Sequence, residues 1–322
     1  MNPKPSHELI PQALAGCFPA LDLAVDVDRA EELSRNMLEF AHRHCLADRK
    51  TLERLGKTAC NCTYFLATYP NASKENQQLA SDIYMWFTAF DDIHAERIDD
   101  TAVDSLARHA FELLDVLGGN TADPAVGFSS ALAEILHRAE KWTLHQQGDL
   151  RNALCGALLS WQWEAQLRNT RSQPSVRTYM DARRHLAAGV LERAIAEQMG
   201  GYVLPDMARQ DPQLIRLKQA FANIGGWVND LCSYEKERRQ EGDSSINLPN
   251  ALMHEEDCTV SDAFTRTSEL ISQEAMTAAE MIQQLSESPF PEVRAYARDT
   301  QHMLRAQTAF YATAGFGRYT DS

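Results

Sequence analysis

Apolar residues recur at steps of three and four along almost the whole chain, and this spacing limits the fold more than any other feature. Leu33, Met37, Phe40 and Ala41 form such a stripe within residues 29–46. The spacing continues through residues 76–92, 101–117, 127–145, 150–168, 175–200, 211–238, 259–287 and 291–312. The sequence lacks strand-type alternation joined by Asn-Gly or Asp-Gly turns. The periodicity therefore predicts an all-α protein.

Short turn-forming segments separate these stretches, and none of them has the length of an interdomain linker. They contain Pro70, Gly118, Pro174, Gly200, Gly242 and Pro289. We find no internal repeat and no low-complexity tract. We therefore expect a single domain over residues 1–322 with about ten helices. The Pro-containing N-terminus, about residues 1–20, is expected to be extended or disordered.

The charge balance excludes several classes of partner. The chain has 45 acidic and 31 basic residues, which gives a net charge of −14. We therefore expect this chain to bind neither nucleic acid nor an anionic membrane, because such partners call for a basic face. No run of about 18 apolar residues is present, so no membrane anchor is expected. The N-terminus does not have the basic region and apolar run of a signal peptide.

The cysteines indicate a reducing compartment. Seven cysteines are scattered along the chain, and only Cys60 and Cys62 are close in sequence. An odd, dispersed set of this kind is typical of free thiols. We therefore expect a cytoplasmic protein without a cysteine metal site.

Two adjacent carboxylates, Asp91 and Asp92, follow the apolar, aromatic stretch at residues 76–90. Carboxylates at the C-terminal end of a helix oppose the helix dipole and repel each other, and a divalent cation would offset both effects. Taken alone, the pair is better explained as a solvated helix end, because short motifs often match by chance. On an ideal helix Asp92 lies about 100° from Asp91 and Glu96 about 140° from it. We therefore predict Asp91 as the metal ligand on this side, and Asp92 and Glu96 stay open as further ligands. Their alternative roles are an ion pair for Asp92 and the orientation of a neighbour for Glu96. His94 is a candidate base for a terminal proton loss, although an exposed position at the helix end explains it better.

A second polar set follows an apolar run at residues 220–228. Asn229, Ser233 and Glu237 are spaced four apart, so they share one face of a helix. An amide oxygen, a hydroxyl and a carboxylate form an all-oxygen ligand set that suits Mg²⁺. Taken alone, this set leaves a metal site and a solvated stripe equally open.

Together the two sets resemble the class I terpene synthases of the microbial type. That family has an acidic motif D-D-x-x-x-E, here Asp91, Asp92 and Glu96, and a later motif N-D-x-x-S-x-x-x-E, here Asn229, Asp230, Ser233 and Glu237. Its motif P-S-x-x-x-Y-x-x-x-R-R is matched at residues 174–184, which places the family's diphosphate-sensing Arg at Arg183. Its C-terminal Arg-Tyr pair is matched by Arg318 and Tyr319. The resemblance covers residues 63–319.

The resemblance implies a class I isoprenoid synthase helical bundle around a central apolar cavity. It implies three Mg²⁺ ions, with Mn²⁺ able to substitute, on Asp91 and on Asn229, Ser233 and Glu237. Arg183, Asn229, Lys236, Arg318 and Tyr319 would bind the diphosphate, and Asp91, Arg183, Asn229 and Glu237 would be catalytic. The reaction would ionise a linear isoprenyl diphosphate, farnesyl diphosphate by default, and cyclise or rearrange the cation. The family also suggests a homodimer.

One residue departs from the family's pattern. Related synthases often carry Gly four residues after the sensor Arg, at a helix break whose carbonyl is thought to help trigger ionisation. Here that residue is Ala187, so a helix break needs more support from its surroundings. The adjacent Arg184 is expected to pair with a carboxylate.

Aromatic side chains are candidates for stabilising the carbocation, because a cation over a ring gains about 0.5–2 kcal/mol. The candidates are Phe87, Phe90, Trp227, Phe65, Trp161 and Tyr311. For any one of them, ordinary core packing is the better explanation.

Three alternatives remain at this point. The substrate could be geranylgeranyl diphosphate rather than farnesyl diphosphate. A chain-elongating prenyltransferase shares the fold but uses two Asp-rich motifs, which the Asn229 set does not match. A non-catalytic helical scaffold would carry its acidic stretches on the surface. Substrate length and product skeleton depend on the contour of the cavity, which no sequence pattern encodes.

Overall fold

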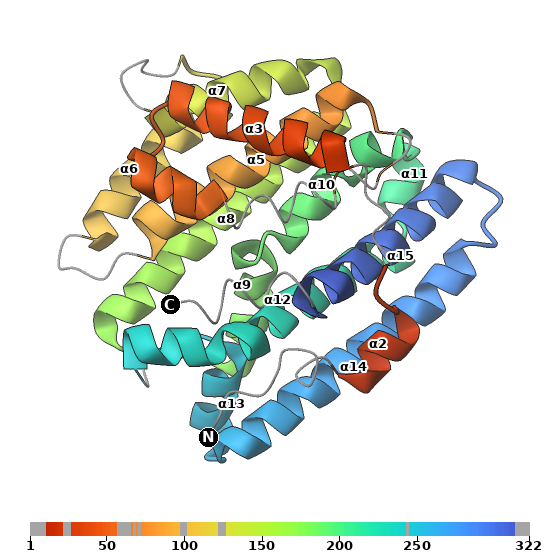
Figure 1. The fold of residues 1–322 in the computed structure, drawn as a ribbon. Coiled ribbons are helices and arrows are strands. Elements are labelled where there is room, and N and C mark those ends of the chain that lie inside the picture. Colours follow the sequence, from red (N-terminus) through yellow and green to blue (C-terminus); the bar gives the residue numbers. More distant parts are fainter. Residues whose placement is uncertain are drawn as a thin grey trace. The chain divides into compact units, whose positions relative to one another are not determined.

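The computed structural model is helical, as the apolar periodicity predicts (Figure 1). It describes residues 11–21, 27–56, 66, 69, 72–96, 102–121, 127–242 and 245–312. No residue within these ranges lies in a β-strand. The all-α fold class is therefore confirmed.

The chain forms two compact units. The first comprises Met1–Asp22, Thr170–Ala196 and Tyr202–Ser322, and the second comprises Leu23–Asn169 and Glu197–Gly201. The second unit contains α3 (Val27–Arg43), α5 (Lys74–Phe90), the π-helix η1 (Asp91–Ala95), α6 (Ala102–Leu117), α7 (Gly127–Arg138), the 3₁₀ helix η2 (Ala139–Lys141) and α8 (Leu144–Thr170). The first contains α2 (Gln12–Cys17), α9 (Val176–Leu186), α11 (Asp206–Arg209), α12 (Pro212–Glu241), α13 (Leu248–Glu256), α14 (Val260–Leu285) and α15 (Pro291–Ala312). Helix α10 (Gly189–Gly200) has residues in both units.

Two sequence expectations about helix boundaries are wrong. Residues 12–17, expected to be extended, form α2, in which Leu14 is buried and Pro11 precedes the first turn. Proline fixes φ near its helical value, and burial of Leu14 stabilises the short helix. The single stretch at residues 175–200 is divided into α9 and α10 by a break at Ala187 and Ala188. The chain therefore has more and shorter helices than the periodicity alone predicts.

All five cysteines among the described residues are free thiols: Cys17, Cys45, Cys155, Cys232 and Cys258. None of the described helices combines the length and the apolar character needed to cross a bilayer.

Helix α12 is the longest helix of the first unit and packs against α9, α14 and α15. Asp211 caps its N-terminus by accepting a hydrogen bond from the Gln213 amide at 2.8 Å, and Pro212 occupies its first position. Gly242 ends the helix with a φ of 68°, a conformation that glycine adopts without strain. Between these ends α12 runs unbroken through Gly225 and Gly226, so these glycines permit close packing rather than a bend.

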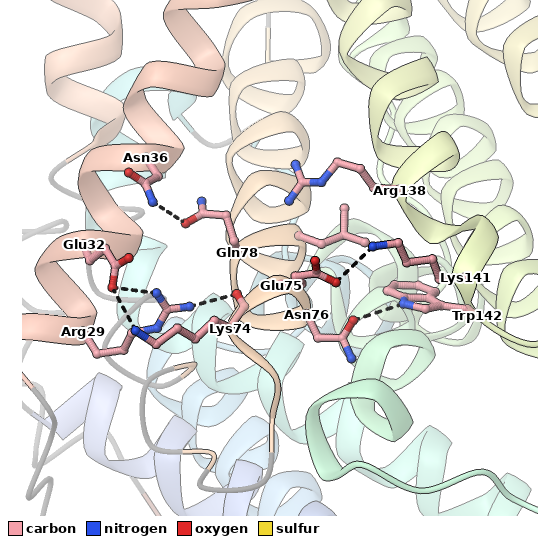
Figure 2. A pocket seen from close by; sticks show the side chains of 11 residues that line it. Arg29, Glu32, Asn36, Lys74, Glu75, Asn76, Gln78, Arg138, Lys141 and Trp142 are labelled. Atoms are coloured by element: carbon pink, nitrogen blue, oxygen red, sulfur yellow. Dashed lines mark hydrogen bonds and ion pairs between the residues drawn. The ribbon is translucent and has the colours of Figure 1, made fainter.

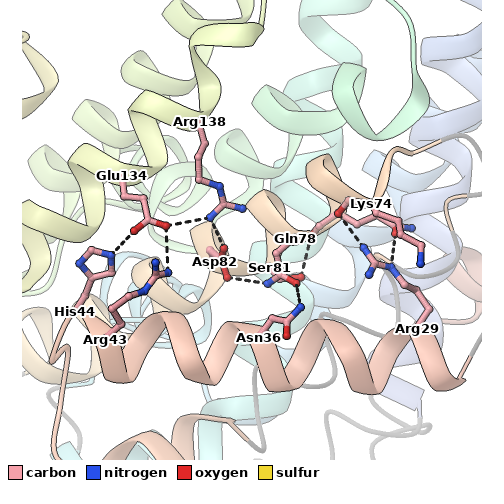
Figure 3. A network of polar contacts seen from close by, with 11 residues as sticks. Arg29, Asn36, Arg43, His44, Lys74, Gln78, Ser81, Asp82, Glu134 and Arg138 are labelled. Atoms are coloured by element: carbon pink, nitrogen blue, oxygen red, sulfur yellow. Dashed lines mark hydrogen bonds and ion pairs between the residues drawn. The ribbon is translucent and has the colours of Figure 1, made fainter.

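Helix α5 is held in the second unit by a polar network with α3 and α7 (Figure 3). Asp82, buried in the middle of α5, accepts hydrogen bonds from Arg138 at 2.6 Å and Gln78 at 2.9 Å. Asn36 of α3 donates to Gln78 at 3.2 Å. Burial raises the pKa of Asp82, although the Arg138 guanidinium acts in the opposite direction. The network fixes the helix whose C-terminal end carries Asp91.

A polar pocket lies beside the N-terminal end of α5 (Figure 2). Its charges are matched internally: Arg29 donates to Glu32 at 2.8 Å, and Lys141 donates to Glu75 at 3.1 Å. The Lys141 pair links η2 to the start of α5, and Arg29 links α3 to it by donating to the Lys74 carbonyl at 2.8 Å. We interpret the pocket as part of the support for this helix, because its cations already face carboxylates.

Candidate active site

Helix α12 carries the predicted ligands Asn229, Ser233 and Glu237 on one face. The Ser233 hydroxyl lies 2.6 Å from Glu237 Oε1 and 2.8 Å from the Asn229 carbonyl oxygen. Ser233 is buried and Glu237 is half-buried. The spacing of four residues therefore places the Ser233 side chain against the Glu237 carboxylate and the backbone of Asn229.

Arg183 of α9 reaches the same face of α12. Its Nη2 atom donates to Asn229 Oδ1 at 2.7 Å and forms an ion pair with Asp230 Oδ1 at 2.7 Å. Gly226 makes this approach possible, because a Cβ at this position would lie 3.0 Å from Arg183 Cγ. The separation of 46 residues in sequence thus becomes a direct contact between the predicted sensor and the predicted ligand.

Asp230 connects three elements around this contact. It is fully buried, and its Oδ2 atom accepts hydrogen bonds from the Tyr179 hydroxyl at 2.8 Å and the Leu248 amide at 3.1 Å. Burial raises the pKa of Asp230 to about 6, while the Arg183 guanidinium acts in the opposite direction. The sequence analysis names Asp230 only as part of a motif. Its position directly after Asn229 could have indicated a contact with the residues that bind near Asn229.

Asn247 is a second residue that sequence reasoning missed. Its Nδ2 atom donates to Glu237 Oε2 at 2.9 Å, and its Oδ1 atom caps α13 by accepting from the Asn250 amide at 3.0 Å. The start of α13 therefore holds the Glu237 carboxylate. Asn247 precedes Leu248-Pro249, which is a common pattern at a helix start and could have indicated the cap.

In the second unit, α5 ends in a π-helical turn that contains Asp91. The Glu96 amide donates to the Asp91 carbonyl at 2.9 Å, which closes the turn between residues five apart. Residues five apart in a π turn lie nearly above one another, whereas the ideal α-helix used above separates them by about 140°. The structure therefore brings Glu96 closer to the side of Asp91 than expected.

Negative charge gathers at Asp91. Burial raises the pKa of Asp91 well above its usual range, and the carboxylates of Glu96, Glu164 and Asp92 raise it further. On α8, Glu164 and Arg168 form an ion pair at 3.3 Å, and Arg168 donates to the Ala95 carbonyl at 3.0 Å. Helix α8 thus supports the π turn, a role that the sequence did not indicate.

Asp92 takes the role that its helical angle predicts. Its Oδ2 atom forms an ion pair with Arg54 Nη1 at 2.7 Å. The Asp92 side chain is buried, whereas the Arg54 side chain is 63% exposed. The two adjacent carboxylates therefore differ in their surroundings: Asp92 faces a guanidinium, whereas Asp91 is buried among other carboxylates.

The predicted aromatic residues of the described chain are all buried. Phe87 and Phe90 lie 4.6 Å and 5.1 Å from the Trp161 ring in the second unit. Trp227 and Tyr311 are buried in the first unit. The indole N–H groups of Trp161 and Trp227 are buried and have no acceptor among the described residues. These contacts show dense aromatic packing, and the role of the rings toward a cation stays a prediction.

His94 is half-buried rather than exposed. Its ring lies 5.0 Å from Phe90 and 4.3 Å from His109. The π turn explains the difference, because it turns residue 94 toward the aromatic packing instead of ending the helix in solvent. Arg184 behaves as predicted and pairs with Asp181 at 3.0 Å.

The break between α9 and α10 forms without the expected glycine. Ala187 caps α9, and Ala188 adopts a left-handed conformation with a φ of 59°. Gly189 follows, and a Cβ there would lie 2.6 Å from Ala222 Cα, so the chain passes very close to α12. The tight approach of α10 to α12 supports the break that Ala187 does not favour.

Three predicted site residues, Phe65, Arg318 and Tyr319, lie outside the described residues. Lys236 is half-buried beside Glu237 on α12.

The donor chemistry of both units fits Mg²⁺. Asn229, Ser233 and Glu237 offer hard oxygen atoms, and so does Asp91. Among the described residues, no cluster of three or more His, Cys, Asp or Glu side chains could hold a metal by itself. A protein typically supplies only one or two ligands to Mg²⁺, and water and phosphate oxygens complete its coordination shell.

The sequence that carries these residues matches a known protein family. Residues 82–276 match the model for "terpene synthase family 2, C-terminal metal binding", which is more than half of the chain. The chain therefore belongs to this terpene synthase family. It is a terpene synthase, an enzyme of the carbon–oxygen lyase class, as the motifs indicate.

Relatives and solved structures agree with this assignment. The chain is 32% identical to a (12E)-labda-8(17),12,14-triene synthase from Streptomyces anulatus over 76% of this chain and 75% of the relative. It is 27% identical to a 4-epi-cubebol synthase from Streptosporangium roseum, a farnesyl diphosphate cyclising enzyme, over 91% and 88%. The fold matches 2-methylisoborneol synthase from Streptomyces coelicolor A3(2), solved with Mg²⁺ and 2-fluoroneryl diphosphate, with a TM-score of 0.82 at 20% identity, covering 94% and 98% of the chains. The class I terpene synthase fold is thus confirmed.

Proposed function

We propose that this terpene synthase ionises an isoprenyl diphosphate with the help of Mg²⁺ and converts the resulting carbocation to a terpene. The observation that carries the proposal is the contact of Arg183 with Asn229 on the face of α12 that also presents Ser233 and Glu237. A guanidinium beside an oxygen ligand set is suited to a diphosphate that is bound together with a cation.

The residues of this face have separate roles in the proposal. Asn229, Ser233 and Glu237 would hold one Mg²⁺, and Asp91 would hold the others of the three expected. When bound, Mg²⁺ offsets the charge of the diphosphate and favours its departure. Arg183 would donate to the leaving diphosphate, with Lys236, Arg318 and Tyr319 as further donors. Asp230 would keep Arg183 oriented through the ion pair.

We favour a C20 substrate over farnesyl diphosphate. The labdatriene synthase is the more similar of the two relatives described, and a labdane has a C20 skeleton. The match to the 4-epi-cubebol synthase covers more of the chain and keeps farnesyl diphosphate as the second candidate. The Asn229 set supports a terpene synthase over a chain-elongating prenyltransferase.

The test is incubation of the full chain with C10, C15, C20 and C25 linear diphosphates and Mg²⁺. Because labdanes contain two fused rings, the panel includes a bicyclic labdane-type C20 diphosphate. Diphosphate release and gas chromatography–mass spectrometry report the reaction, and Mn²⁺ replaces Mg²⁺ in a parallel series. A scaffold would release no diphosphate from any substrate. A prenyltransferase would give elongated products with added isopentenyl diphosphate.

A second test concerns the two units. We propose that they act in one reaction as a single catalytic domain. In that case Asp91→Asn and Asn229→Ala would each remove most of the activity. The double variant would lose little more, because the effects of replacing residues that act in the same step do not add. Independent losses that multiply would contradict a common step.

A further inference from the structure

The last turn of α9 rests directly on α12 at Gly226. A Cβ at this position would lie 3.0 Å from Arg183 Cγ and 3.4 Å from Ala187 Cβ. Asn223 lies three residues before Gly226 and Asn229 three residues after it, about 4.5 Å along the helix axis on either side. A step of three residues turns a helix by about 300°, so the three positions share one face of α12.

Two adjacent arginines of α9 contact α12 on the two sides of Gly226. Arg183 Nη2 donates to Asn229 Oδ1 at 2.7 Å, and Arg184 Nε donates to Asn223 Oδ1 at 2.8 Å. Neighbouring residues on a helix point about 100° apart, which allows the two side chains to reach different turns of α12. The first contact belongs to the proposed diphosphate site. The second is not explained by that site.

Asn223 interrupts the apolar stretch at residues 220–228 and is only 4% exposed. Its Nδ2 atom donates to Glu274 Oε1 of α14 at 3.0 Å. Glu274 in turn accepts two hydrogen bonds from Arg216 Nη2, at 2.9 Å and 2.8 Å. A carboxylate only accepts and a guanidinium only donates, so the two ends of the Asn223 amide cannot exchange places. Helix α14 therefore holds this amide in the orientation that receives Arg184.

Stability alone does not account for this polar cluster. Replacing both partners of a buried hydrogen bond by apolar groups of the same shape can be nearly neutral for stability. A fully paired polar group in a core instead gives its partner one defined position. The partner here is Arg184, which directly follows the predicted diphosphate-sensing residue Arg183.

The two arginine contacts differ in what a bound diphosphate would do to them. A diphosphate at Asn229 would compete for the hydrogen atoms of the Arg183 guanidinium. The contact of Arg184 with Asn223 lies on the far side of Gly226 and would persist. Helix α9 has only 11 residues and is followed by the left-handed residue Ala188, so no continuing helix holds its last turn.

We propose that Asn223 is a positioning residue for the diphosphate site. Through Arg184 it holds the last turn of α9 on α12, and it thereby keeps Arg183 beside Asn229 while the Arg183 guanidinium binds the diphosphate. This inference rests on the proposed function.

The first experiment measures binding of inorganic diphosphate by calorimetry at saturating Mg²⁺. In Asn223→Leu the dissociation constant should rise about tenfold, because Arg183 is no longer held in place for a charged hydrogen bond. Asp181→Asn is the matched control, since it removes the exposed partner of Arg184 and leaves Asn223 in place. Its dissociation constant should stay within about twofold of wild type. A wild-type value in Asn223→Leu would overturn the proposal.

The second experiment asks whether Asn223 acts through Arg183. Asn223→Leu is combined with Arg183→Ala, and diphosphate binding is measured in the same way. In the Arg183→Ala background the added Asn223→Leu change should weaken binding by less than about twofold, because the group that Asn223 positions is already absent. The same tenfold weakening with and without Arg183 would show that the substitution only loosens the fold.

A third variant keeps the test decisive if Asn223→Leu does not fold. Asn223→Leu with Arg184→Met replaces both partners by apolar side chains, which leaves neither of them unpaired. It should weaken diphosphate binding by the same factor as Asn223→Leu, and melting temperatures report its folding. An unchanged dissociation constant in this double variant would overturn the role of Asn223. Failure of wild type to release diphosphate from any isoprenyl diphosphate would instead overturn the proposed function.

Discussion

The amide of Glu96 donates to the carbonyl of Asp91 at 2.9 Å, and this one hydrogen bond decides where the Glu96 side chain lies relative to Asp91. An ordinary α-helical turn would direct Glu96 away from Asp91. The π turn brings the two carboxylates to neighbouring positions, and Glu96 raises the pKa of Asp91. Turns of this type are frequent at functional sites.

This relationship predicts that Glu96 contributes to cation binding. In Glu96→Gln, the Mg²⁺ concentration for half-maximal diphosphate release should rise about fivefold to twentyfold, because one negative charge near Asp91 is lost. The increase in melting temperature caused by Mg²⁺ and diphosphate should shrink in parallel. Glu75→Gln, an exposed glutamate at the other end of α5, serves as the control. Equal Mg²⁺ requirements in the two variants would contradict the prediction.

The adjacent carboxylates Asp91 and Asp92 should differ sharply when each is replaced by asparagine. Asp91→Asn should lower kcat/KM by a factor of about 100 or more, because a metal ligand is lost. Asp92→Asn should lower it less than about tenfold, since this residue pairs with Arg54. Arg54→Ala should resemble Asp92→Asn, and the double variant should add little to either. Steady-state kinetics of diphosphate release measure all four enzymes.

Loss of the Asp230 charge should destabilise the fold as well as the site. Asp230→Asn removes the ion pair of Asp230 with the largely buried Arg183, and removing one partner of a buried pair costs about 3–5 kcal/mol. Asparagine keeps an acceptor for Tyr179, so we expect a loss of about 2–4 kcal/mol in the free energy of unfolding. Urea unfolding measures this loss. Asp181→Asn, at an exposed position of α9, should change stability by less than about 1 kcal/mol.

The left-handed residue Ala188 predicts a stabilising substitution. An L-residue in this conformation costs about 1–2 kcal/mol, and glycine avoids the cost at the expense of greater freedom in the unfolded chain. Ala188→Gly should therefore raise the free energy of unfolding by about 0.5–1 kcal/mol. Ala187→Gly, where φ is −88°, should lower it instead. A thermal or urea melt in which both variants lose stability would show that the strain at Ala188 is relieved elsewhere.

The sequence predicts those features that depend on local spacing. The helix of Asn229, Ser233 and Glu237 follows from the apolar run before it and the interval of four residues. The different roles of Asp91 and Asp92 follow from the angle of about 100° between them on a helix. These features depend on one helix and its period, whereas the partner of Asp92, Arg54, comes from another segment of the chain.

The remaining features depend on contacts between helices. The π turn at Asp91 is supported by Arg168 of α8, and the break after Ala187 is supported by the approach of Gly189 to Ala222. Asn247 acts on Glu237 only because α13 starts beside α12. In each case the residue that decides the geometry lies far along the chain from the residue that it affects. The helical period contains no information about such partners.

Helix α12 has a consequence for how its two ends of contact can change. The same unbroken helix carries Asn229, Ser233 and Glu237 and, one turn before Asn229, Gly225, which lies against Gln307 of α15. A substitution on α15 would therefore alter the packing of α12 next to Asn229 without replacing any of the predicted ligands.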